Sequence, residues 1–119
     1  MRCAAALLAL AAGTAAAAPA EPGRYDAQLC VATRPEAAPT CGAADVDVTA
    51  SGIRVRVADI VYRLELHAAA LDVETMHGAL QIDEFSAAYD WQGSTLRFSD
   101  DAKNVRYEVR IGARRAAAP

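Results

Sequence analysis

Strict alternation of apolar and charged residues in two stretches limits the folds that this chain can adopt. Residues 53–57 read Ile-Arg-Val-Arg-Val, and residues 105–111 read Val-Arg-Tyr-Glu-Val-Arg-Ile. A period of two places the apolar side chains on one face of a β-strand and the charged side chains on the other. Both stretches are therefore predicted to be strands with one face buried and the other in water.

Further strands are expected at residues 24–33 and 43–50, and the apolar parity shifts twice in the remaining chain. The shift at residues 58–59 fits either a hairpin turn or a bulge in one bent strand. The shift between Ile82 and Phe85 indicates a bulge or a strand end.

Residues 64–77 fit two interpretations. Apolar residues at a spacing of three to four, followed by Gly78, form one stripe of a helix with a glycine cap. Residues 62–66 and 71–74 instead alternate with a period of two, so we favour strands over a helix here.

Tight turns bring the C-terminal strands into a common register. Turns at residues 92–93 and 100–103 place Phe98 opposite Ala87 on one neighbouring strand and opposite Val105 on the other. A wrong register would scatter the apolar residues over both faces, whereas this one keeps them together.

The predicted turns imply two further side-chain pairings across neighbouring strands. The turn at residues 100–103 places Arg97 opposite Arg106, so that Arg97→Glu is expected to be neutral or mildly stabilising. A turn at residues 77–78 would place Val73 opposite Ile82 on the next strand.

These patterns predict an all-β fold, a small antiparallel β-sandwich or β-barrel of seven to nine short strands with one disulfide. The expected organisation is a signal peptide at residues 1–20, a single β domain at 21–112 and a flexible C-terminal tail at 113–119. The signal peptide is indicated by Arg2, a short alanine- and leucine-rich run, and the small residues around Ala18 and Ala20. Cleavage is expected after Ala20, with Ala18 as the alternative, and the product is expected to be periplasmic or secreted, with no membrane span.

Cysteine usage agrees with export. Cys3 would leave with the signal peptide, which leaves Cys30 and Cys41 in the mature chain. An even pair in an exported protein predicts a disulfide, and a loop of this size contributes about 2–3 kcal/mol to stability. The formal net charge of −3 comes from interspersed charges of both signs without a basic stripe, so nucleic acid is not an expected partner.

Residues that could carry chemistry do not form a known motif. His67 and His77 invite a metal-site hypothesis with Asp72 or Glu74, but they lie in different elements and lack ligand spacing, so we expect no metal and no cofactor. Asp83-Glu84 is expected to point to opposite strand faces and Asp100-Asp101 to occupy a turn. The serines lie in no nucleophile elbow, so no catalytic residue and no enzymatic activity are expected.

Aromatic residues gather in the last third of the chain. Tyr89, Trp91, Phe98 and Tyr107 fall on one predicted face, which is expected to be the core. Trp91 adjoins the predicted turn, where it either caps the core or anchors a partner. Trp91, Tyr89 and Gln92 are therefore the candidate binding rim.

The function expected from these observations is that of an exported, non-catalytic β protein of the cell envelope that binds another protein. A small carrier of an apolar ligand or lipid is the first alternative, and a periplasmic hydrolase inhibitor is the second. In size, export and strand content the chain is similar in architecture to the periplasmic lysozyme inhibitors of the membrane-bound C-type-inhibitor family. Residues 76–80 are the nearest stretch to that family's S-G-x-x-Y loop and do not match it. The partner and the oligomeric state are left open.

Overall fold

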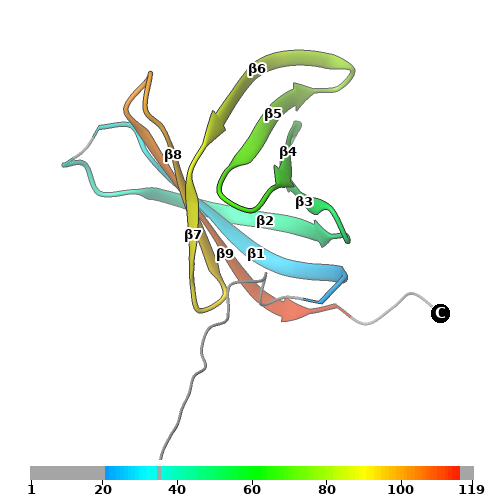
Figure 1. The fold of residues 1–119 in the computed structure, drawn as a ribbon. Coiled ribbons are helices and arrows are strands. Elements are labelled where there is room, and N and C mark those ends of the chain that lie inside the picture. The colour runs from blue at the N-terminus through cyan, green and yellow to red at the C-terminus, as the bar shows by residue number, and fades with distance from the viewer. Residues whose placement is uncertain (1–20, 35, 116–119) are drawn as a thin grey trace, which may run out of the picture.

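A computed structural model describes residues 21–34 and 36–115, and in this part of the chain it contains nine strands and no helix (Figure 1). The strands are β1 (Gly23–Ala32), β2 (Thr40–Val48), β3 (Gly52–Val57), β4 (Ile60–Leu66), β5 (Leu71–His77), β6 (Leu80–Ala87), β7 (Tyr89–Gln92), β8 (Thr95–Asp100) and β9 (Val105–Arg114). The predicted all-β fold is confirmed. The predicted signal peptide at 1–20 lies outside the described residues.

All nine strands belong to one antiparallel sheet in the order β6-β5-β4-β3-β2-β1-β9-β8-β7. The sheet curls until β6, at one end of this order, contacts β8 near the other end (Figure 1). The fold is therefore a nearly closed barrel, which decides between the barrel and the sandwich that the sequence left open.

One continuous stretch of chain closes the barrel, because β6 runs into β7 through Ala88 (Figure 1). The first half of this stretch pairs with β5 and the second half with β8. Before Ala88, Lys103 Nζ donates to Asp83 Oδ2 at 2.8 Å and ties β6 to the β8–β9 loop. After Ala88, the Tyr89 hydroxyl donates to the His67 carbonyl oxygen at 2.5 Å. These side-chain contacts join the two ends of the sheet at the seam near β6 and β8, where the described strands form no backbone pairing.

The structure decides the two alternatives that the sequence left open, at residues 64–77 and at residues 58–59. Residues 64–77 form β4, a short loop and β5 instead of a helix, and the His67 N–H donates to the Ala70 carbonyl oxygen across that loop at 2.8 Å. The parity shift at 58–59 is a hairpin turn in which Ala58 has a φ of 53°. Two-residue hairpin turns require such left-handed conformations.

The C-terminal hairpins keep the predicted faces, but their strand partners are shifted by two residues. Gly93, with a φ of 61°, is the first turn residue, so the turn is 93–94 and not 92–93. The β8–β9 loop spans 101–104 instead of 100–103, with Phe98 opposite Tyr89 and Tyr107 instead of its predicted partners. The predicted register was wrong because it placed each turn one residue too early.

This shift reverses the predicted surroundings of Arg97. Its neighbours across the sheet are Asp90 on β7 and Glu108 on β9, not Arg106. The Arg97 guanidinium donates to both carboxylate oxygens of Asp90, at 2.7 and 3.3 Å, and this bond lowers the pKa of Asp90. The expected repulsion is therefore wrong, and the expectation that Arg97→Glu would be tolerated loses its basis.

The β5–β6 hairpin also differs from its predicted register. Its turn is 78–79, with Gly78 at a φ of 63°. A bulge on β6 then leaves Ile82 as an extra residue, so that Val73 pairs with Phe85 instead of Ile82. The parity shift predicted between Ile82 and Phe85 is this bulge.

The core fills the inside of the barrel. An aromatic cluster near the seam is centred on Tyr107, whose ring centroid lies 5.0 Å from that of Phe98, 5.8 Å from that of Phe85 and 6.2 Å from that of Tyr62. The other buried apolar residues come from most of the strands: Tyr25, Leu29, Ala44, Val46, Val48, Ile53, Val55, Leu64, Leu71, Val73, Leu96, Val109 and Ile111. The predicted aromatic face is therefore an inner face.

The N- and C-terminal strands lie side by side, and the predicted disulfide lies on one of them. Cys30 and Cys41 pair directly across β1 and β2 with a Cα–Cα separation of 4.0 Å, which confirms the pair at disulfide distance. The expected tail boundary is wrong, because β9 continues to Arg114, which pairs with Tyr25. Arg115 also ion-pairs with Asp26, at 2.8 Å, and with Asp45.

Candidate functional site

The predicted binding rim lies beside the β7–β8 turn. Trp91 and Tyr89 are half-buried and pack against the core, and Gln92 is exposed. The Tyr89 hydroxyl is already engaged with the His67 carbonyl oxygen across the seam. These contacts give Tyr89 a part in closing the barrel and place Trp91 against its core, and the role of both residues in binding stays a prediction.

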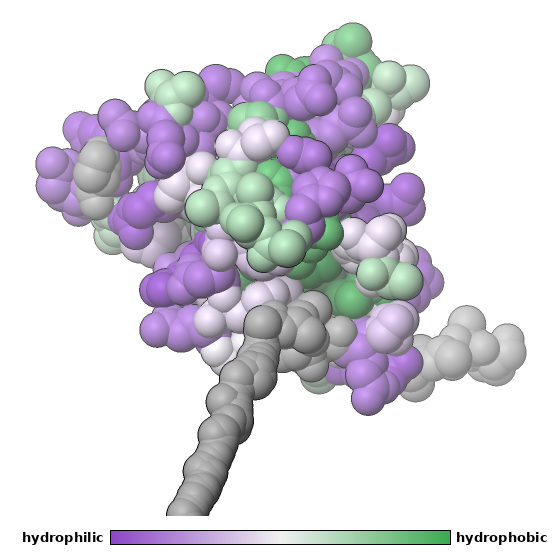
Figure 2. All heavy atoms as spheres, in the orientation of Figure 1, coloured by the Kyte–Doolittle hydropathy of each residue, from purple (hydrophilic) through white to green (hydrophobic). Residues whose placement is uncertain are grey.

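Two large apolar side chains are exposed at the far end of the β5–β6 hairpin. Leu80 is 64% exposed and Ile82 is 51% exposed. Figure 2 shows apolar surface over the projecting end of this hairpin, at the upper right. The sequence analysis missed this feature because it placed Ile82 opposite Val73, whereas the bulge removes Ile82 from that position.

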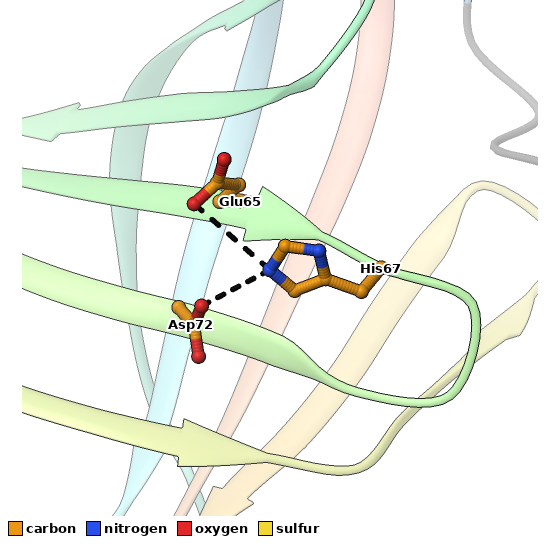
Figure 3. A group of neighbouring side chains, drawn as sticks. All are labelled: Glu65, His67 and Asp72. Carbon is orange, nitrogen blue, oxygen red and sulfur yellow. Dashed lines mark hydrogen bonds and ion pairs between the residues drawn. The ribbon is translucent and has the colours of Figure 1, made fainter.

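A cluster of Glu65, His67 and Asp72 lies where β4 and β5 meet their connecting loop (Figure 3). Strand pairing places Glu65 directly opposite Asp72. The next residue after β4, His67, directs its Nε2 atom toward both carboxylates, at 3.0 Å from Asp72 Oδ2 and 3.9 Å from Glu65 Oε1 (Figure 3). The three ligand atoms lie within 4.8 Å of one another, and all three residues are exposed.

Neighbouring strands orient this cluster. The Ser86 hydroxyl on β6 donates to Asp72 Oδ1 at 2.5 Å, and His67 contacts the other carboxylate oxygen. The pKa of Asp72 is lowered, first by the hydrogen bond from Ser86 and then by the one from His67. Asp72 is therefore a carboxylate at neutral pH with one oxygen directed toward Ser86 and the other toward His67.

The connectivity of Ser86, Asp72 and His67 differs from that of a nucleophile relay. In a serine hydrolase the histidine lies between the serine and the carboxylate, because it must accept the serine proton. Here Asp72 lies in the middle and engages both other side chains. The order of the three side chains is therefore not that of a serine-hydrolase relay.

The outer face next to the cluster is recessed and lined by carboxylates and by two arginines, Arg54 and Arg63. A recess of about 540 Å³ extends over β3, β4 and β5 and includes Glu65 and Asp72 in its wall. Glu74 and Glu84, which also line it, pair directly across β5 and β6. Like charges in this arrangement are unfavourable without a compensating cation. Arg63 supplies one, at 3.3 Å from Glu74 Oε1.

A second recess of about 500 Å³ lies over the start of β7 and the neighbouring parts of β8 and β9. Its charged side chains include Asp90, Arg97 and Glu108, which stand side by side on neighbouring strands. Arg97 is bonded to Asp90 and stands between the two acids, so acidic and basic groups alternate across the strands that line this recess.

The sequence analysis considered His67 with Asp72 but did not include Glu65. It compared His67 with His77, whose Nε2 atom lies 4.0 Å from Asp59 Oδ2 at another hairpin. The signal that would have found the cluster is the four-residue loop after Leu66, because that loop pairs Glu65 with Asp72.

Compared with known proteins, the chain matches no protein-family model, no curated protein and no solved structure. Within residues 21–34 and 36–115, no helix has the length and apolar character of a membrane span. The functional argument therefore rests on the geometry of this chain.

Proposed function

We propose that this chain is an exported, non-catalytic module that binds another protein of the cell envelope through the β5–β6 hairpin. The observation that carries the proposal is the exposure of Leu80 and Ile82 at the projecting end of that hairpin. Large apolar side chains that are grouped and exposed are a feature of interaction surfaces.

The edge of β6 defines the partner's shape. β6 pairs with β5 along one edge, and its other edge is tied to the β8–β9 loop at Asp83, so the open part of that edge is the hairpin end at Leu80 and Ile82. Unpaired strand edges accept an extended segment of another chain, with main-chain hydrogen bonds giving affinity and side chains giving selectivity. The occupant is therefore an extended segment of the partner protein, which adds a strand beside Leu80 and Ile82.

Charge defines the partner's composition. Glu84 lies on β6 directly opposite Glu74 on β5, and the neighbouring Asp83 is already bonded to Lys103. A segment that combines apolar residues with lysine or arginine complements this edge. The disulfide-distance pair Cys30–Cys41 supports an oxidising, exported compartment for the encounter.

Photocrosslinking in cells that export the chain tests the proposal. A photoreactive amino acid replaces Ile82 in one variant and Ala43, an exposed residue of β2, in the control. The expected result is one adduct of discrete mass at Ile82, absent at Ala43 and lost when Leu80→Asp is added. A synthetic peptide with the crosslinked segment should then bind the purified chain and shift the β6 amide signals.

Three outcomes would contradict the proposal: no adduct at Ile82, the same adduct at Ala43, or an adduct of twice the chain mass. The last would identify a second copy as the occupant. The apolar-ligand carrier and the hydrolase inhibitor stay predictions, tested by native mass spectrometry of the purified chain and by a lysozyme inhibition assay.

A further inference from the structure

A mixed set of metal ligands stands apart from the β5–β6 hairpin end. It consists of one imidazole and two carboxylates, contributed by His67, Glu65 and Asp72. Imidazole nitrogen is a ligand for zinc and other transition metals, whereas magnesium and calcium prefer oxygen alone. The donor set therefore selects a class of cation.

The distances suit a tetrahedral ion. Bonds of about 2.0–2.2 Å at tetrahedral angles place ligand atoms about 3.3–3.6 Å apart. The two distances from His67 Nε2, 3.0 Å to Asp72 and 3.9 Å to Glu65, lie on either side of that range. Figure 3 shows all three side chains directed to one point above the β4–β5 strand pair, so only small side-chain rotations are needed.

Contacts around the set hold it in place independently of any ion. Ser86 fixes Asp72 through Oδ1, which leaves Oδ2 on the side of His67. The Tyr89 hydroxyl binds the main-chain carbonyl of His67 and so anchors the loop that carries the imidazole. Partners of this kind, which orient ligands, are a regular part of metal sites in proteins.

Electrostatics favours a divalent cation at this point. Glu65 and Asp72 are like charges in direct cross-strand register, and His67 is the only basic group in the set. The recess that extends from the cluster is otherwise balanced, because Glu74 and Glu84 line it together with Arg54 and Arg63, so the negative charge at this point is that of Glu65 and Asp72 themselves. A dipositive ion bound to neutral His67 would balance the two carboxylates.

We propose that Glu65, His67 and Asp72 form a surface site for a divalent transition-metal ion, best matched to Zn²⁺, with the fourth position open to water or to a ligand from another molecule. The proposal departs from the expectation drawn from the sequence that the chain holds no metal site. It does not depend on the protein-binding function, because no residue of the set lies at the hairpin end.

Calorimetric titration of the purified exported chain with ZnCl₂ tests the site, with Cys30 and Cys41 oxidised so that no thiol competes. The expected result is saturable binding of one equivalent. His67→Ala, Glu65→Gln and Asp72→Asn should each weaken it by at least about tenfold, since loss of an orienting partner alone costs 10–100-fold. Mg²⁺ and Ca²⁺ should not compete.

His77→Ala is the matched control, because His77 also lies near a carboxylate but belongs to no three-ligand group of the described residues. It should leave zinc affinity unchanged. Thermal unfolding without metal confirms that each exposed substitution leaves the fold intact, and histidine NMR signals should show His67, not His77, shifting on titration. Absence of saturable binding, binding that survives His67→Ala, equal loss in His77→Ala, or competition by Mg²⁺ would each overturn the proposal.

Discussion

Truncation of Phe98 is the sharpest test of which face of β8 fills the barrel. Phe98 is 5% exposed, and its ring centroid lies 5.0 Å from that of Tyr107 and 6.3 Å from that of Phe85. Burial of a side chain of this size contributes about 1.5–3 kcal/mol, and each aromatic pair adds about 0.5–1.5 kcal/mol. Phe98→Ala should therefore cost about 3–5 kcal/mol, as is usual for a phenylalanine that leaves a cavity.

This loss is large for so small a domain. At about 0.05–0.15 kcal/mol per residue, the whole fold is stable by roughly 5–14 kcal/mol. Phe98→Ala should therefore remove a third or more of the stability of an average domain of this length. Phe98→Leu keeps most of the volume and should cost clearly less than Phe98→Ala.

Urea unfolding followed by Trp91 fluorescence and by far-ultraviolet circular dichroism measures the change. Ser99→Ala, one residue along β8 and on the opposite face, is the control and should change stability by less than about 0.5 kcal/mol. A one-residue slip of β8 would exchange these faces. A cost below about 1 kcal/mol for Phe98→Ala, or an equal cost for Ser99→Ala, would refute this assignment of the faces of β8.

Three further predictions concern other contacts of the barrel. Cys30→Ser should lower stability by about 2–3 kcal/mol in urea unfolding, and native protein should show no free thiol at Cys30 or Cys41 until it is reduced; free thiols in unreduced protein would contradict the pair. Arg97→Glu should lower the melting temperature, because it places a third carboxylate between Asp90 and Glu108, and the loss should shrink at high salt; an unchanged or raised melting temperature would contradict the cross-strand contacts. Burial, together with nearby Tyr62 and carboxylates, raises the pKa of Tyr107 to about 12, so stability linked to its neutral form is complete below about pH 10 and is lost as the pH rises toward 12. Absorbance titration at alkaline pH should show a component near pH 12 that disappears in Tyr107→Phe, and loss of a component near pH 10 instead would refute the assignment.

Some of the candidate functional features could be predicted from the sequence and others could not. His67 and His77 were considered with Asp72 or Glu74 as a metal-site hypothesis, which was set aside because the two histidines lack ligand spacing. Glu65 could be added to the candidate ligands only once the length of the β4–β5 loop was known, because that length sets which residues of the two strands face one another. Ile82 is exposed because of a bulge in β6. The sequence indicated a bulge, but it did not indicate which side chain the bulge would expose.

The sequence by itself determined the all-β class, which face of each C-terminal strand is buried and which cysteines pair. These properties follow from a period of two and from an even cysteine count, and both are local or compositional signals. A shift of a strand by two residues preserves that period, so the pattern that assigned Phe98 to the core was unable to choose its partners. The partners were decided by the left-handed backbone at Gly93 and Asn104, which fixes where each turn begins or ends. Closure of the barrel, with Tyr89 reaching the His67 carbonyl across the seam, depends on the curl of the whole sheet, which only the tertiary structure supplies.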